Sequence, residues 1–129
     1  MCSSDLNPSL SSLIDSTIGS GWRLDLNQLK RLAPHAERED FRNAFLAVKH
    51  ANKARLAEHI RVSTGVVVDP ASLFDVQVKR IHEYKRQLLN VLQVVARYQA
   101  MLADLETANP ADWVPRTVIF AGKAASMAW

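Results

Sequence analysis

Apolar residues recur along residues 74–105 first with one period and then with another. Phe74, Val76 and Val78 alternate with polar residues, which places them on one face of an extended segment and predicts a strand. From Gln87 onward the spacing lengthens to three or four residues, which predicts a helix of about five turns at ~3.6 residues each. The apolar stripe of that helix comprises Leu88, Val91, Leu92, Val95, Tyr98, Leu102 and Leu105.

A second strand is predicted after this helix. Residues 106–115 are polar and contain an Asn-Pro turn signal at 109–110. Residues 117–121 are apolar without alternation, as is typical of a parallel strand that is covered on both faces. Strand, helix and strand in this order predict one right-handed βαβ unit. Lys123 then falls at the next strand-to-helix turn, either beside the first turn or as an ordinary surface lysine.

Two short helices are predicted near the start of the chain. Asn7 followed by Pro8 is typical of an N-cap and a first helical residue, and Gly19 is a plausible stop for that helix. Asp25 predicts the cap of a second helix, which Pro34 is expected to end. The residues of the second helix that we expect to face inward are Leu26, Leu29 and Leu32.

A third, longer helix is predicted over about residues 36–61, with a break at residues 63–65. The histidines of this region lack the i, i+4 spacing of a helical zinc site, so no metal is expected. We expect Trp22 to be a packing residue. The apolar stripe of the third helix comprises Phe41, Phe45, Val48, Asn52, Leu56 and Ile60.

Composition narrows the class of protein. The 129 residues suit one ordinary domain, and 48% hydrophobic with 22% charged residues indicates a globular chain. Apolar runs are too short for a membrane span, the first residues do not resemble a secretory signal, and one cysteine allows no internal disulfide. The formal net charge of +3 favours anionic partners.

The strand and the helix are joined by residues 79–86 (KRIHEYKR), which carry four fixed positive charges and a histidine. Ligands of open α/β sheets bind beyond the carboxyl ends of the strands, where this turn falls. Clustered cations repel one another unless they share an anion, and phosphate suits Arg, Lys and helix N–H groups. Short basic runs are also typical of solvated surfaces and nucleic-acid patches. A nucleic-acid-binding module and a structural helical domain therefore remain alternatives.

Residues 74–89 (FDVQVKRIHEYKRQLL) resemble, without a gap, the signature of the α-glucan phosphorylases. These pyridoxal-phosphate enzymes cleave glycogen, starch or maltodextrin with inorganic phosphate. Residues 7–14, 19–32 and 115–125 fit the same family in the expected order, so the resemblance covers nearly the whole chain.

The resemblance implies an α/β chain of three helices (residues 7–65) followed by a strand–helix–strand segment (residues 66–125). Both would belong to the Rossmann-like C-terminal domain of a GT-B-type glycosyltransferase fold. Residues 1–6 and 126–129 depart from the family pattern, and we expect them to be non-native ends introduced by cloning, sequencing or truncation.

The activity implied by the resemblance is release of α-glucose 1-phosphate from terminal α-1,4 bonds, with pyridoxal phosphate acting through its phosphate group. The partners would be an α-1,4-glucan and inorganic phosphate, with no nucleic acid and no membrane. The full-length enzyme would be a cytoplasmic homodimer subject to allosteric control. The lysine that anchors the cofactor is expected in a later segment, so the isolated chain should be inactive.

The motif assigns roles residue by residue. Arg80 and Lys85 resemble the residues that grip the substrate phosphate, and Lys79 resembles the residue set near the cofactor phosphate. Arg86 is expected to cover the helix surface. Gating or positioning at the mouth of the cleft is implied for His82, Glu83 and Tyr84.

Overall fold

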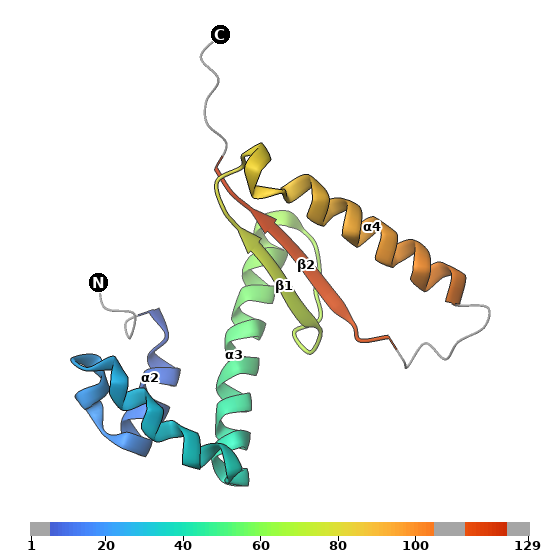
Figure 1. Ribbon diagram of the computed structural model, residues 1–129. Coiled ribbons are helices and arrows are strands. Elements are labelled where there is room, and N and C mark those ends of the chain that lie inside the picture. The colour runs from blue at the N-terminus through green and yellow to red at the C-terminus, as the bar shows by residue number, and fades with distance from the viewer. Residues whose placement is uncertain (1–5, 105–112, 124–129) are drawn as a thin grey trace. The chain divides into compact units, whose positions relative to one another are not determined.

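The computed structural model describes residues 6–104 and 113–123. The chain divides into two compact units, Met1–Val67 and Val68–Trp129, which are coloured blue to green and green to red in Figure 1. No described helix is long and apolar enough to cross a lipid bilayer. Four sequence predictions fall wholly or largely outside the described residues: the head at residues 1–6, of which only Leu6 is described, Leu105, the turn at 109–110 and the tail at 126–129.

The first helix of unit 1 has the predicted ends. Helix α2 (Pro8–Ile18) begins after Asn7, whose Oδ1 accepts a hydrogen bond of 3.3 Å from the backbone N–H of Leu10. It ends before Gly19. Trp22, in the 3-10 helix η1 (Ser20–Arg23), is only 8% exposed, and its indole Nε1 donates to Asp15 at 2.8 Å. The N-cap, the stop and the packing role of Trp22 are therefore confirmed.

The second predicted helix is a 3-10 helix, η2 (Leu26–Glu37), capped by Asp25 as expected. Two predictions about it are wrong. Pro34 lies inside η2 rather than at its end, because the fixed φ of proline suits a 3-10 turn and its missing N–H removes only one bond. Leu26 is 68% exposed. It is the first residue of η2, and its side chain tilts toward the N-terminal end of the helix, beyond the helix body.

Helix α3 (Glu39–Thr64) starts and ends three residues later than predicted. Arg38 keeps an extended backbone with φ −84° and ψ 126°, which delays the start. At the other end the Thr64 hydroxyl donates to the carbonyl of Ile60 at 2.8 Å, and the helix stops only at Gly65 with φ 76°. Glycine adopts this left-handed conformation without the cost that a Cβ imposes.

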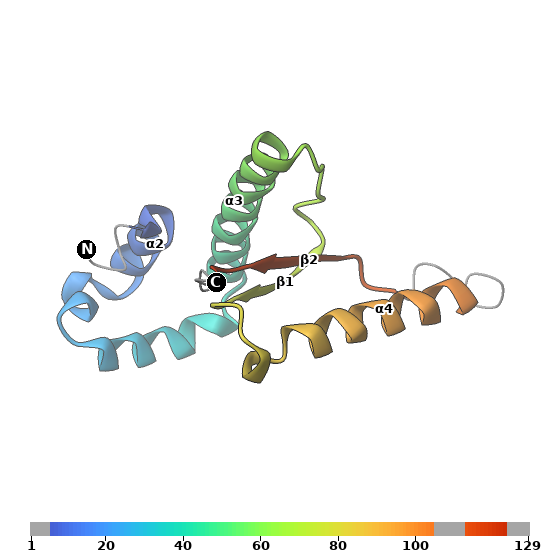
Figure 2. The same ribbon diagram turned by 90° about the horizontal axis from the view of Figure 1, so that it is seen from above.

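Unit 2 contains strand β1 (Leu73–Val78), the short 3-10 helix η3 (Glu83–Lys85), helix α4 (Gln87–Asp104) and strand β2 (Arg116–Ala121). Figures 1 and 2 show the two strands side by side, with α4 between them in the chain and running back in the opposite direction. The strands are parallel and pair in register, so the predicted strand–helix–strand order is confirmed.

Both strands of unit 2 are incompletely buried. Val76 and Val78 are 48% and 63% exposed, whereas Gln77 on the opposite face is half-buried. Gln77 contacts α4, since its Oε1 accepts a 2.8 Å hydrogen bond from Nδ2 of Asn90. The expected covering of β2 on both faces is wrong in the described part of the chain, since Phe120 is 41% exposed.

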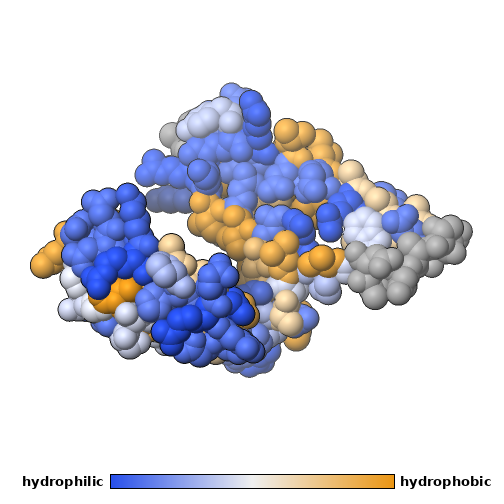
Figure 3. Space-filling model, turned by 60° about the horizontal axis from the view of Figure 1, so that its bottom comes forward, coloured by the Kyte–Doolittle hydropathy of each residue, from blue (hydrophilic) through white to orange (hydrophobic). Residues whose placement is uncertain are grey.

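Several large apolar side chains reach the surface, which is why orange areas interrupt the hydrophilic surface in Figure 3. Each described member of the α4 stripe is at least 41% exposed. One helix beside two strands provides too few layers to bury an apolar stripe completely.

Candidate anion-binding site

The predicted basic turn forms the connection between β1 and α4. Lys79 and Arg80 follow directly after the last strand residue, and Lys85 closes η3. Arg86 joins η3 to α4. The structure therefore places the predicted cations where a parallel strand ends and a helix starts, which is the position of ligand sites in open α/β sheets.

The start of the turn continues the pairing of the two strands. The N–H of Lys79 donates to the carbonyl of Ala121 at 3.1 Å, and the N–H of Ile81 donates to the carbonyl of Lys123 at 3.2 Å. Lys123 therefore lies beside the turn through its backbone, while its side-chain role stays a prediction. Gly122 lies between these two bonds, and a Cβ there would approach the carbonyl oxygen of Lys79 to 2.2 Å.

The middle of the turn brings three of the predicted residues together. The Nδ1 of His82 accepts a 3.5 Å hydrogen bond from the N–H of Tyr84, and their rings lie 4.3 Å apart. The Nζ of Lys85 lies 5.3 Å from the centre of the Tyr84 ring, within cation–π range. His82 therefore caps η3 while Tyr84 supports the lysine.

Arg86 has a left-handed backbone with φ 57°, the only positive φ of a non-glycine residue in the described part of the chain. This conformation costs a residue with a Cβ roughly 1–2 kcal/mol. The strained residue lies where the chain leaves η3 and enters α4. The N–H of Arg86 donates to the carbonyl of Glu83 at 3.1 Å. The surrounding turn therefore holds Arg86 in a conformation that the residue alone would not prefer.

Three cations of the turn are free of ion pairs within the part of the chain that the structure describes. Among the residues that the structure describes, no ion pair involves Lys79, Arg80 or Lys85. The carboxylate on the adjoining strand, Asp75, instead accepts from Nη1 of Arg116 at 2.7 Å. Positive charge at the turn is thus available to an anion, and phosphate is one anion that both an Arg fork and a Lys point charge suit.

Sequence reasoning missed the side chains that hold the turn. Gln77, Gln87 and Asn90 were assigned only to a strand or a helix, yet the two glutamines hydrogen-bond to turn backbone and Asn90 holds Gln77. The available signal was the presence of side-chain amides on both sides of the basic run. A half-buried amide needs hydrogen-bond partners, and the turn backbone between them could provide these.

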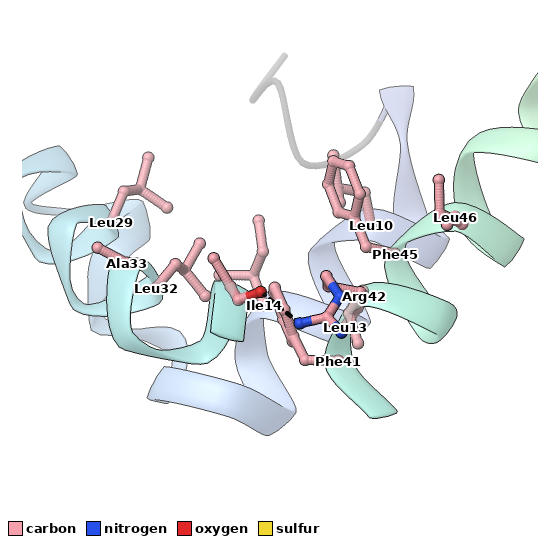
Figure 4. A pocket seen from close by; sticks show the side chains of 11 residues that line it. Leu10, Leu13, Ile14, Leu29, Leu32, Ala33, Phe41, Arg42, Phe45 and Leu46 are labelled. Atoms are coloured by element: carbon pink, nitrogen blue, oxygen red, sulfur yellow. Dashed lines mark hydrogen bonds between the residues drawn. The ribbon is translucent and has the colours of Figure 1, made fainter. Parts of the chain in front are cut away.

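Unit 1 contains a separate groove of about 640 Å³, shown in Figure 4. The Arg42 guanidinium at this groove donates to the carbonyls of Ala36 and Glu37, at 3.1 and 2.7 Å. An apolar groove with one internally bonded arginine has no acid, base or nucleophile for catalysis. The lining residues are Leu10, Leu13, Ile14, Leu29, Leu32, Ala33, Ala36, Phe41, Arg42, Phe45 and Leu46.

A parallel strand–helix–strand unit with a basic turn between its first strand and its helix defines an α/β protein with a candidate anion site. The carbohydrate phosphorylase family profile matches residues 4–129 of this sequence. The chain therefore belongs to the carbohydrate phosphorylase family, and the resemblance seen in the motif is confirmed.

Curated relatives agree with this assignment. A glycogen phosphorylase of Haemophilus influenzae is 54% identical over 120 residues, and one of Pasteurella multocida is 53% identical over 120 residues. The cytosolic alpha-glucan phosphorylase 2 of Arabidopsis thaliana is 45% identical over 119 residues. These alignments cover 93%, 93% and 92% of this chain but only 14% of each relative.

Proposed function

We propose that this chain is the phosphate-gripping part of an α-1,4-glucan phosphorylase. The observation that carries the proposal is a basic turn at the junction of β1 and α4 whose Lys79, Arg80 and Lys85 form no ion pair with a described residue, in a chain of the carbohydrate phosphorylase family. The reaction would break the terminal α-1,4 bond of a glucan, join C1 of the released glucose to a phosphate oxygen with retained configuration, and return a proton to the glucan 4-hydroxyl.

Arg80 and Lys85 are the proposed grip on the substrate phosphate. A guanidinium can bind two phosphate oxygens at once, and a lysine ammonium can follow the phosphate as it changes from free ion to ester. Catalysis by these residues would consist of positioning and of stabilising charge in the transition state. His82, Glu83 and Tyr84 are proposed to position or gate substrate at the cleft.

The same turn suits the phosphate group of pyridoxal phosphate. Lys79 makes no ion pair in the described part of the chain and directly precedes Arg80. Its ammonium group is therefore the proposed neighbour of the cofactor phosphate. When bound, the cofactor would keep its phosphate group and act through it on the substrate phosphate nearby. Two phosphate groups close together repel, and Lys79, Arg80 and Lys85 would reduce that repulsion.

The proposed setting is a cytoplasmic homodimer under allosteric control, acting on glucan and phosphate without nucleic acid or membrane. The names of the relatives differ on location, since one from Arabidopsis thaliana is cytosolic and one from Ipomoea batatas is chloroplastic or amyloplastic.

A hybrid enzyme tests the proposal. The segment of Haemophilus influenzae glycogen phosphorylase that aligns with this chain is replaced by the 120 matching residues. We expect the hybrid to release glucose 1-phosphate from an α-1,4-glucan only when inorganic phosphate is present. A hybrid that is folded by circular dichroism, binds pyridoxal phosphate and shows no phosphorolysis would contradict the proposal.

The isolated 129-residue chain is expected to be inactive. Its alignment covers 14% of the Haemophilus influenzae relative, and the resemblance implies that the cofactor's anchoring lysine lies elsewhere. We expect no glucose 1-phosphate and no cofactor retention when the chain is mixed with glucan, phosphate and pyridoxal phosphate. Cofactor absorbance that survives borohydride reduction and gel filtration would show this expectation to be wrong.

A further inference from the structure

We propose that Gln87 and Gln77 are positioning residues that set the phosphate grip by holding the backbone at its two ends. The inference rests on the proposed function of the turn, because it concerns Arg80 and Lys85 as phosphate ligands. It assigns a role to two side chains through the backbone that they hold.

Gln87 holds the first end of the turn. It is the first residue of α4, and its side chain reaches back along the turn. Nε2 donates to the carbonyl of Arg80 at 3.1 Å, and Oε1 accepts from the N–H of His82 at 3.4 Å. One amide therefore uses both its donor and its acceptor on the backbone that flanks Ile81.

Gln77 holds the second end. It lies near the end of β1, and its Nε2 donates to the carbonyl of Lys85 at 3.3 Å. Its Oε1 accepts from Nδ2 of Asn90 at 2.8 Å, so α4 fixes the orientation of this amide. The two glutamines thus tie the residue at each end of the grip to the strand or helix beside it.

These ties act on a turn that has little regular structure between β1 and α4. Arg80, His82, Glu83 and Tyr84 are exposed, η3 has three residues, and Arg86 has a left-handed backbone. A binding group must be held within about 0.5 Å of its productive position, and long cationic side chains are costly to order. Holding the carbonyls of Arg80 and Lys85 restricts the backbone of these two residues. Fewer conformations of their side chains then remain to be ordered when phosphate binds.

The test replaces Gln87 by methionine in the hybrid enzyme. Methionine has a similar length and helix propensity but neither donates nor accepts as an amide does. Losing two neutral hydrogen bonds should raise the KM for phosphate about tenfold. We expect the KM for glucan and the melting temperature to change little, and kcat to fall less than the phosphate KM rises.

Gln93→Met is the matched control, because Gln93 is an exposed glutamine of the same helix, α4. It should leave the phosphate KM unchanged. Gln77→Met tests the second end in the same way and replaces Gln87→Met should that variant fail to fold. The expected result is again a selective rise in the phosphate KM.

Three outcomes separate the two proposals. An unchanged phosphate KM in Gln87→Met and Gln77→Met, with strong loss in Arg80→Ala, overturns the positioning role and leaves the proposed function intact. Equal rises in both KM values, or a lowered melting temperature with an unchanged phosphate KM, indicate a structural role and also overturn it. Full activity in Arg80→Ala overturns the proposed function of the turn itself.

Discussion

Replacing Arg80 by alanine in the hybrid enzyme should lower phosphorolysis by roughly two to four orders of magnitude, the scale of losing a preorganised donor at developing charge. Among the described residues Arg80 forms no ion pair, so the substitution frees no paired carboxylate and removes mainly the proposed phosphate ligand. The measurement is initial release of glucose 1-phosphate over a range of phosphate concentrations.

Two further variants define what Arg80 supplies. Arg80→Lys keeps the charge and loses the two-pronged fork, so we expect intermediate activity. Arg55→Ala removes another exposed arginine, from α3, and should leave turnover unchanged. Near-normal turnover in Arg80→Ala, or an equal loss in Arg55→Ala, would remove Arg80 from the proposed role.

The elements of unit 2 could be predicted because their signals are local. Alternation at Phe74, Val76 and Val78 needs only neighbouring residues, and so does the three-to-four spacing after Gln87. Both periods are set by backbone geometry rather than by the rest of the fold. The observed β1 and α4 match them, and the basic turn falls between the two as expected.

Other features depend on contacts between distant residues and could not be read from periodicity. The exposure of Val78, for example, depends on how few elements cover β1. The left-handed Arg86 is a non-glycine residue at a position where sequence rules favour glycine. Such departures are expected at functional sites, where local preference yields to geometry.

The amide network shows the same limit at the site. Gln77 and Asn90 lie 13 positions apart, and only the return of α4 beside β1 brings their side chains to 2.8 Å. The motif identified the cations through resemblance, but it gave no account of what holds them. That account came from the hydrogen bonds of half-buried amides, which a one-dimensional pattern does not contain.

Replacing Gly122 by alanine should disrupt the site without removing a charge. The new Cβ would lie 2.2 Å from the carbonyl oxygen of Lys79, more than 1 Å short of ordinary contact at 3.4 Å. The obstacle is backbone, so no side-chain rotation relieves it, and the bonds of Lys79 to Ala121 and of Ile81 to Lys123 must lengthen. Overpacking of this kind typically costs about 1–3 kcal/mol.

The displaced segment carries Lys79 and Arg80, so the activity of the hybrid should fall about 100-fold, as when a reacting group is misplaced by about 1 Å. Initial rates and the phosphate KM measure this loss. Gly65→Ala is the matched control, because its φ of 76° imposes conformational strain while open space surrounds the new Cβ. It should cost stability of about 1 kcal/mol and leave the phosphate KM unchanged. Unaltered kinetics in Gly122→Ala would mean that the carbonyl of Lys79 can move freely, and that the start of the turn does not set the grip.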